Sequence, residues 1–191
     1  MKKLIFLCVM ALSSMDSFAQ LWDNSKPDKR VTFGVRAGVN NSTYSLSVDK
    51  DWWEDNLKSR WGFHGGLNMD INFYKSFALE TGLFYSEKGF KNEGFDKNVK
   101  MGFIQVPVQA LTRLYLKDDV YLSAKAGGFV ACAVKKEEYH KDVDAGLSFG
   151  AGIAIKKIFL GVQYELGLLS LDRDFSGGKT GNLAISIGYD F

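Results

Sequence analysis

The sequence predicts an all-β fold, an eight-stranded antiparallel up-and-down transmembrane β-barrel, and three observations lead to this prediction. Apolar and polar residues alternate with a period of two over eight segments. These segments are nine to thirteen residues long, which is enough for a tilted strand to cross a bilayer. The connections between them are alternately long and short, as in barrels with short turns at one end and longer loops at the other.

Clean alternation predicts the first four strands. Residues 31–40 place valine, phenylalanine and alanine on one face of a strand and threonine, glycine, arginine and asparagine on the other. Residues 61–72, which begin with tryptophan, and residues 77–86 and 104–116 alternate in the same way. Pro107 lies inside the fourth segment. Because proline cannot donate a hydrogen bond to a ladder, we expect a bulge or a local break there.

The last four strands are predicted at residues 120–130, 147–155, 158–168 and 183–191. The final strand places leucine, isoleucine, tyrosine and phenylalanine on one face and alanine, serine, glycine and aspartate on the other. Such a strand leaves an edge that must be paired. We expect it to pair with residues 31–40, because closure removes the edge.

The predicted connections alternate in length along the whole chain. Four long connections lie at residues 41–60, 89–100, 135–144 and 170–180, and three short turns lie at 73–76, 117–119 and 156–157. The long connections therefore share one end of the barrel, which we expect to be external. The turns and both termini share the periplasmic end.

The amino terminus predicts export. Residues 1–19 have the pattern of a secretory signal peptide, with two lysines, an apolar run and small residues before the cleavage site. We expect residues 20–30 to form a short periplasmic segment and residues 31–191 to form the outer-membrane β-barrel domain. No later stretch reaches the about 20 consecutive apolar residues of a transmembrane helix.

Composition excludes several kinds of function. Without residues 1–19 the chain holds 22 basic and 21 acidic residues, a balance that gives no indication of nucleic acid as a partner. Cys132 is then the single thiol, so no intramolecular disulfide can form. One cysteine and two histidines do not make a metal-ligand cluster, and we expect no metal and no cofactor.

Charged residues recur near the middle of the strands, on the face opposite the apolar one. The alternative interpretation of the apolar face is the buried core of a soluble sheet. Charged residues in such a dry protein core would be costly. The lumen of an eight-stranded barrel is just wide enough for side chains to fill, so charges there can neutralise one another. We expect Arg36 to pair with Glu80 or Glu165, and Arg113 or Lys125 to pair with the remaining carboxylate. A gated or narrow ion path is the alternative to this closed lumen. The same face carries Gln105, Gln109, Gln163, Asp70 and Asp190.

Aromatic residues of the first long connection are candidates for recognition. Tyr44, Trp52 and Trp53 lie there among charged residues. Exposed aromatic side chains can bind sugars, lipid headgroups or a protein partner. The alternative is that they fold back onto the barrel rim as an interfacial belt.

His64 offers a weak indication of lipid-modifying chemistry. Histidine with serine and an acidic partner can catalyse acyl transfer. No spacing along the sequence identifies such a catalytic group of histidine, serine and acid. A lone histidine at a strand end is more typical of a hydrogen-bonding residue in the lumen. The partners considered are Ser42, Ser45 or Ser47 and Asp51 or Glu54.

Four segments resemble the PorT-like family of outer-membrane β-barrels. They are the residues FGVRAGVN at 33–40, LETGLFYSEKG at 79–89, IQVP at 104–107 and FGAG at 149–152. The resemblance covers nearly all of the mature chain and implies a small eight-stranded barrel. The namesake of the family is implicated in a machine that secretes proteases. The resemblance also implies insertion by the barrel assembly machinery, with Tyr189 and Phe191 of the terminal strand as the assembly signal.

The sequence thus predicts a non-enzymatic integral outer-membrane barrel that acts through its external loops in a structural, adhesion or secretion-associated role. Expected partners are outer-membrane lipid and lipopolysaccharide, the barrel assembly machinery and an envelope or secretion protein. A lipid-modifying barrel enzyme and a soluble periplasmic ligand-binding barrel are the alternatives.

Overall fold

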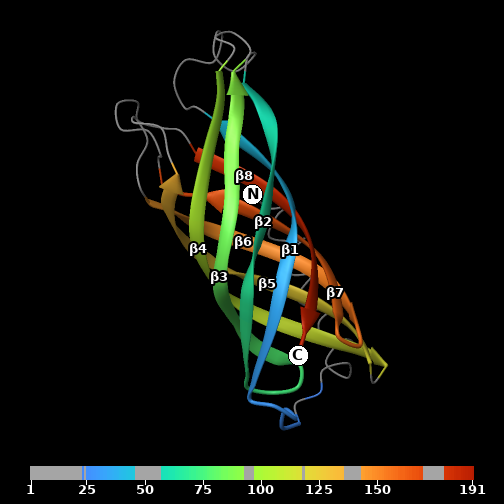
Figure 1. The fold of residues 1–191 in the computed structure, drawn as a ribbon. Coiled ribbons are helices and arrows are strands. Elements are labelled where there is room, and N and C mark those ends of the chain that lie inside the picture. The colour runs from blue at the N-terminus through green and yellow to red at the C-terminus, as the bar shows by residue number, and fades with distance from the viewer. Residues whose placement is uncertain are drawn as a thin grey trace, which may run out of the picture.

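The computed structural model describes residues 23, 25–45, 57–92, 97–117, 119–135, 143–169 and 179–191. Its eight strands form one closed barrel in which each strand is antiparallel to its neighbours and β8 pairs with β1 (Figure 1). This closure confirms the predicted fold class. Within these residues there is no helix long and apolar enough to cross a membrane.

The strands follow one another around the barrel in chain order. They are β1 (Val31–Ser45), β2 (Leu57–Asn72), β3 (Phe77–Asn92), β4 (Lys97–Lys117), β5 (Val120–Lys135), β6 (Val143–Ile155), β7 (Ile158–Gly167) and β8 (Lys179–Asp190). We call the end with the short connections 73–76, 118–119 and 156–157 the turn end, and the opposite end the loop end. The strand boundaries at the turn end agree with the predicted ones to within one or two residues.

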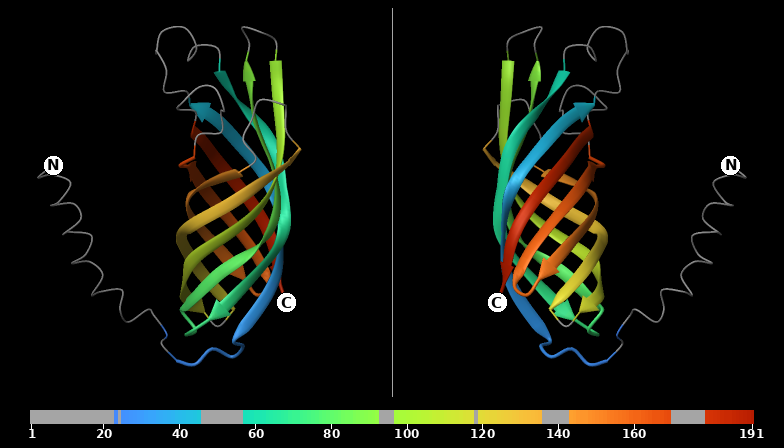
Figure 2. Two further views of the ribbon diagram at one scale, coloured as in Figure 1. Left: turned by 90° about the vertical axis from the view of Figure 1, so that its left-hand side faces the viewer. Right: turned by 90° about the vertical axis from the view of Figure 1, so that its right-hand side faces the viewer.

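The strands other than β7 are longer than predicted at the loop end. β3 continues to Asn92 and β4 begins at Lys97, so four residues lie between these strands where a connection of twelve was predicted. Charged residues interrupt the apolar alternation here, because this part of the sheet extends beyond the apolar belt of the barrel. The side formed by β2, β3 and β4 rises beyond β6 and β7 (Figure 2).

Pro107 leaves a gap in the ladder but does not change the register. β3 and β4 pair through Thr81↔Val108 and again through Phe84↔Gln105, with the same register on both sides of the gap. The hydroxyl of Thr81 donates a hydrogen bond to the carbonyl oxygen of Pro107 at 2.8 Å. The local break expected from the sequence is therefore present. The register shifts of β4 lie instead in its pairing with β5, between Gly102 and Phe103 and between Tyr115 and Lys117.

The two faces of the sheet have opposite chemistry. Large apolar side chains are exposed on the outer surface along all eight strands, with aromatic ones such as Trp61, Phe63, Tyr164 and Tyr189 among them. Charged and amide side chains are buried inside the barrel. A soluble domain does not expose an apolar surface of this extent, whereas a bilayer requires it.

Candidate functional site

Two arginine–carboxylate pairs close the lumen at the turn end. Arg113 of β4 donates to Asp70 at 2.5 Å and to Asn72 at 2.7 Å, both on β2. Arg36 of β1 lies 2.6 Å from a carboxylate oxygen of Asp190 on β8. Both arginines are buried. Because each guanidinium is paired, this end of the lumen is filled without an unbalanced charge.

The middle of the lumen holds a third ion pair and a small cavity. The ammonium group of Lys125 on β5 lies 2.6 Å from Glu80 on β3. Between the strands is a cavity of about 50 Å³, lined among others by His64, Glu80, Gln105 and Lys125. A cavity of this size holds a few water molecules. It has no room for an acyl chain or a sugar.

Lys88 pairs with Glu165 toward the loop end. The ammonium nitrogen of this fully buried lysine lies 2.9 Å from Glu165 and 4.0 Å from Asp144. It also lies 4.6 Å from the ring centroid of Phe129. The carboxylate of Glu165 accepts further hydrogen bonds from Gln105, Gln163 and Asn182.

The lumen beyond Lys88 is filled by apolar side chains and by contacts between β1 and β3. A buried apolar cluster joins β4 and β5 and consists of Met101, Phe103, Phe129 and Ala131. Asn40 of β1 donates to the carbonyl oxygen of Glu87 at 2.8 Å, and Ser42 donates to that of Gly89 at 3.0 Å. These side chains and contacts occupy the lumen at this level.

The structure places all five ionisable residues singled out in the sequence inside the barrel, but it changes their pairing. Arg36 pairs with Asp190 instead of Glu80 or Glu165, and Arg113 pairs with Asp70. Lys125 pairs with Glu80, which is one of the pairs expected from the sequence. Glu165 pairs with a residue that the sequence reasoning missed, Lys88.

A continued alternation could have identified Lys88. It lies in phase with Phe84 and Ser86 on the inner face of β3, and the predicted strand stopped at Ser86. The pairing partners could not be identified from the alternation, since it assigns a face but not the stagger between strands on opposite sides of a barrel.

Comparison with known proteins assigns the family. The outer membrane protein beta-barrel domain family matches residues 18–173 of the chain. The chain belongs to this family. It is therefore an integral outer-membrane barrel. In such barrels the short turns lie in the periplasm and the longer loops lie outside the cell, so we call the turn end the periplasmic end and the loop end the external end.

Solved structures resemble the outer-membrane barrel at low identity. Neisserial surface protein A (NspA) matches with a TM-score of 0.51 and 15% identity over 85% of this chain and 100% of that one. Ail, the attachment invasion locus protein of Yersinia pestis, matches with a TM-score of 0.46 and 17% identity over 85% and 100%. OprG from Pseudomonas aeruginosa matches with a TM-score of 0.45 and 15% identity over 89% and 99%. No protein with a curated description matches the chain.

His64 of the outer-membrane barrel contacts a serine other than those considered from the sequence. Its Nε2 lies 2.8 Å from the hydroxyl of Ser186 on β8, whereas Ser42 bonds to Gly89. The Nδ1 of His64 has no hydrogen-bond partner among the described residues. Among the described residues, no acidic group therefore orients this imidazole as in a catalytic triad. Ser47, Asp51 and Glu54 fall outside those residues.

The structure describes only some of the remaining candidates of the outer-membrane barrel. Trp52 and Trp53 fall outside the described residues, and of Tyr44 only the backbone is described, paired with Thr180. At the periplasmic end, the rings of Tyr189 and Phe191 meet edge to face at 5.5 Å on the exposed outer surface. The described residues contain no group of three or more potential metal ligands.

Proposed function

We propose that this outer-membrane barrel is a non-enzymatic and non-conducting membrane component that acts through its external loops. The observation that carries the proposal is the filled lumen. Four buried or half-buried ion pairs and an apolar cluster occupy it from the periplasmic to the external end. With the lumen closed, the parts of the molecule available to other molecules are its two ends and its lipid-facing wall.

A planar-bilayer experiment tests this proposal. We expect the purified barrel, once inserted in a planar lipid bilayer, to produce no discrete current steps under applied voltage, because no water-filled path crosses the lumen. Heat-modifiable migration on a gel checks that the inserted protein is folded. Reproducible current steps would contradict a closed lumen. If Glu165→Gln, which removes one lumen charge, changed the size of those steps, the result would support the narrow ion path.

The enzymatic alternative has less support from the geometry. The neighbourhood of His64 and Ser186 is a cavity of about 50 Å³ inside the barrel. An acyl-transfer substrate must bring its carbonyl within about 3 Å of the nucleophile, and lipid lies on the opposite side of the barrel wall. A lipid substrate therefore cannot reach this pair without opening the barrel.

The external role that we propose is structural, adhesive or associated with secretion. Its support is the resemblance of the sequence to the PorT-like family, whose namesake is implicated in protein secretion. Tyr44, Trp52 and Trp53 remain our candidates for contact with an envelope or secretion protein. We further propose that residues 1–19 are a signal peptide and that lipopolysaccharide surrounds the external half of the wall.

The terminal strand supports a role in assembly. Tyr189 and Phe191 are exposed to the surroundings of the barrel, where they make no contribution to the lumen. We propose that they are the signal for the barrel assembly machinery. Phe191→Ala is then expected to lower the amount of folded barrel in the outer membrane several-fold.

The matched control for this assembly prediction is Phe33→Ala. Phe33 is exposed to the same extent as Phe191, 56% against 57%, and also lies near the periplasmic end. Quantitative blotting of unheated membranes measures the folded barrel. An equal decrease in both variants would show that Phe191 contributes only lipid-facing surface.

A further inference from the structure

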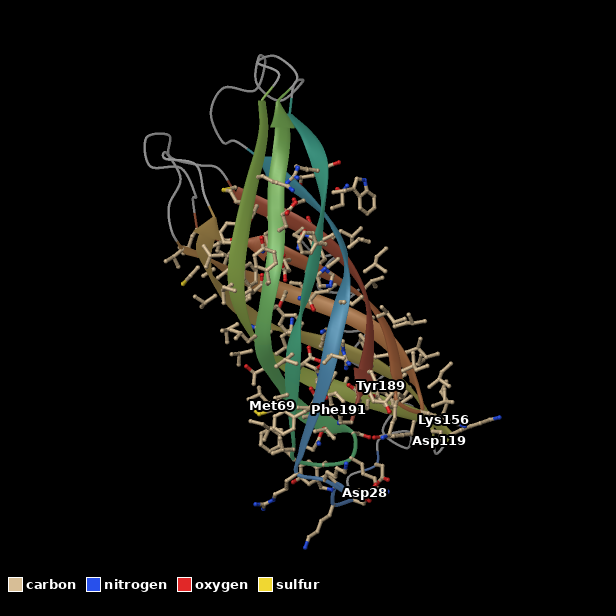
Figure 3. All side chains as sticks on the ribbon, in the orientation of Figure 1. Asp28, Met69, Asp119, Lys156, Tyr189 and Phe191 are labelled. Atoms are coloured by element: carbon tan, nitrogen blue, oxygen red, sulfur yellow. The ribbon has the colours of Figure 1, made fainter. Side chains whose placement is uncertain are left out.

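The periplasmic mouth of the barrel is a bowl lined mostly by polar and charged residues, and none of the functions above requires it. Its volume is about 290 Å³, and its boundary includes residues 27–29, Lys75, Arg113, the turn 156–157 and Asp190. We propose that this periplasmic bowl binds an acidic peptide segment of a periplasmic partner. Asp28, Asp119, Lys156 and Phe191 mark this end of the molecule in Figure 3.

The floor of the bowl is electrically neutral. Asp70 is paired with Arg113, and Asp190 is paired with Arg36 and accepts a hydrogen bond from Tyr121 at 3.4 Å. The guanidinium of Arg113 also lies 5.7 Å from the centre of the Tyr121 ring. These carboxylates are already satisfied, so they do not repel an anion that enters from the periplasm.

The rim of the bowl is basic. Lys29, Lys75, Lys156 and Lys157 line it, and Asp28 is the acidic residue of the lining outside the floor. Asp23 opposes Lys75 at 3.7 Å, and hydrogen bonds with Ser25 hold the pKa of Asp23 below its ordinary value. Outside the floor, the described residues of this end include seven basic side chains and three acidic ones. The basic ones are Lys26, Lys29, Arg30, Lys75, Lys117, Lys156 and Lys157.

Hydrogen bonds hold the rim in position. The amide of Asn72 donates to the carbonyl oxygen of Lys29 at 2.9 Å, which fixes the amino-terminal segment beside the mouth. The backbone N–H of Lys156 donates to the carbonyl oxygen of Asp119 at 2.6 Å, and the backbone N–H of Asp190 donates to the carbonyl oxygen of Lys157 at 2.8 Å. Lys156 has a φ of 56°, a left-handed conformation that a lysine rarely adopts. A rim fixed in this way loses little conformational freedom when a ligand binds.

The position of the bowl favours a peptide over a membrane lipid. Asp70, Asn72 and Arg113 point into the lumen and form the inner part of the lining, so the bowl opens inside the ring of strands. Lipid headgroups surround the outside of that ring, where the ammonium of Lys157 lies 5.6 Å from the Tyr189 ring. A flexible chain with carboxylate side chains can enter from the periplasm, and complementary charge would steer it there.

Binding of a fluorescein-labelled octaglutamate peptide tests the proposal. The full barrel is placed in nanodiscs of phosphatidylcholine, and fluorescence anisotropy is followed as protein is added. We expect saturable binding that weakens with salt. Lys29→Gln with Lys156→Asn is expected to weaken it about ten-fold by removing two amines of the rim. Asparagine at position 156 keeps the left-handed turn, because it tolerates this conformation.

Lys100→Gln is the matched control. Lys100 is half exposed and lies in β4 toward the external end, so its loss should leave peptide binding unchanged. Equal weakening by both variants, or no saturable binding to the folded wild-type barrel, would overturn the proposal. Loss of peptide binding when phosphatidylglycerol is included in the nanodisc would assign the rim to lipid headgroups instead.

Discussion

Replacing Lys88 with methionine is expected to destabilise the folded barrel by about 3–5 kcal/mol, the usual cost of removing one partner from a buried ion pair. Lys88 is 2% exposed, and its ammonium group lies 2.9 Å from Glu165 and 4.0 Å from Asp144. Methionine keeps the unbranched, flexible shape of the side chain and removes the ammonium group that lies over the Phe129 ring. The change therefore isolates the loss of the charge, which leaves two carboxylates close together in a dry part of the lumen.

A second substitution shows whether the effect belongs to the ion pair. In the Lys88→Met background, Glu165→Gln removes one of the two uncompensated carboxylates and keeps one oxygen, which can still accept from Gln105 and Gln163. We expect the double variant to lose less stability than the sum of the single changes, because the two residues act as a pair. Urea-induced unfolding from lipid vesicles, followed by tryptophan fluorescence, measures each free energy of unfolding.

Lys100→Met is the control for this first prediction. Lys100 also lies within ion-pair distance of a carboxylate, 3.2 Å from Glu87, but its side chain is 52% exposed. Exposed pairs contribute about 0–1 kcal/mol, so this change should have little effect. If Lys88→Met costs no more than Lys100→Met, the Lys88 pair is as well solvated as an exposed one, and the closed lumen proposed above would be wrong.

The alternation of the sequence predicts which residues face the lumen, and it does so because the two sides of the barrel wall meet different solvents. Arg36, Glu80 and Glu165 can be assigned to the interior from their phase within apolar strands. The same rule stops working where the outer face meets water, since apolar residues are no longer required there. The predicted third strand ended at Ser86 for this reason, so Lys88 was not assigned to the lumen.

The pairing inside the lumen depends on quantities that no single strand contains. Asp190 reaches Arg36 because β8 closes on β1 with Gly34 opposite Asp190 and Arg36 opposite Gly188. Gly188 has no side chain between the two charged groups: a Cβ atom there would lie 2.3 Å from Cδ of Arg36. The stagger of the closing strands and the position of a glycine thus decide a contact that composition and phase leave open.

Gly38 has a similar role at the closing seam, and its replacement by valine is expected to prevent efficient closure of the barrel. Gly38 lies in β1 opposite His64 of β2 and Ser186 of β8. A Cβ atom on Gly38 would lie 1.9 Å from the carbonyl oxygen of Ile185 and 2.8 Å from Cε1 of His64. The imidazole can turn away, but the carbonyl belongs to the ladder that joins the first and last strands.

The cost of this substitution should exceed that of ordinary overpacking. Extra methyl groups in a packed core cost about 1–3 kcal/mol when neighbouring side chains can adjust. At Gly38 the backbone of β8 must move, which weakens the β1–β8 hydrogen bonds that remove the last open edge. In lipid an unpaired edge is not tolerated, so we expect Gly38→Val to reduce the yield of heat-modifiable barrel several-fold on refolding into detergent.

Gly65→Ala separates this steric effect from a general intolerance of larger residues in the first hairpin. Gly65 lies in β2 opposite Ala37, and a Cβ atom there would meet its nearest neighbour, the carbonyl oxygen of Arg36, at 3.6 Å. That is an ordinary van der Waals distance, so Gly65→Ala should refold as the wild-type chain does. Gly38→Ala, the smallest possible addition, should already lower the urea midpoint, since the clash begins at Cβ. Unchanged refolding of both Gly38 variants would mean that β1 and β8 can separate at this point without opening the barrel.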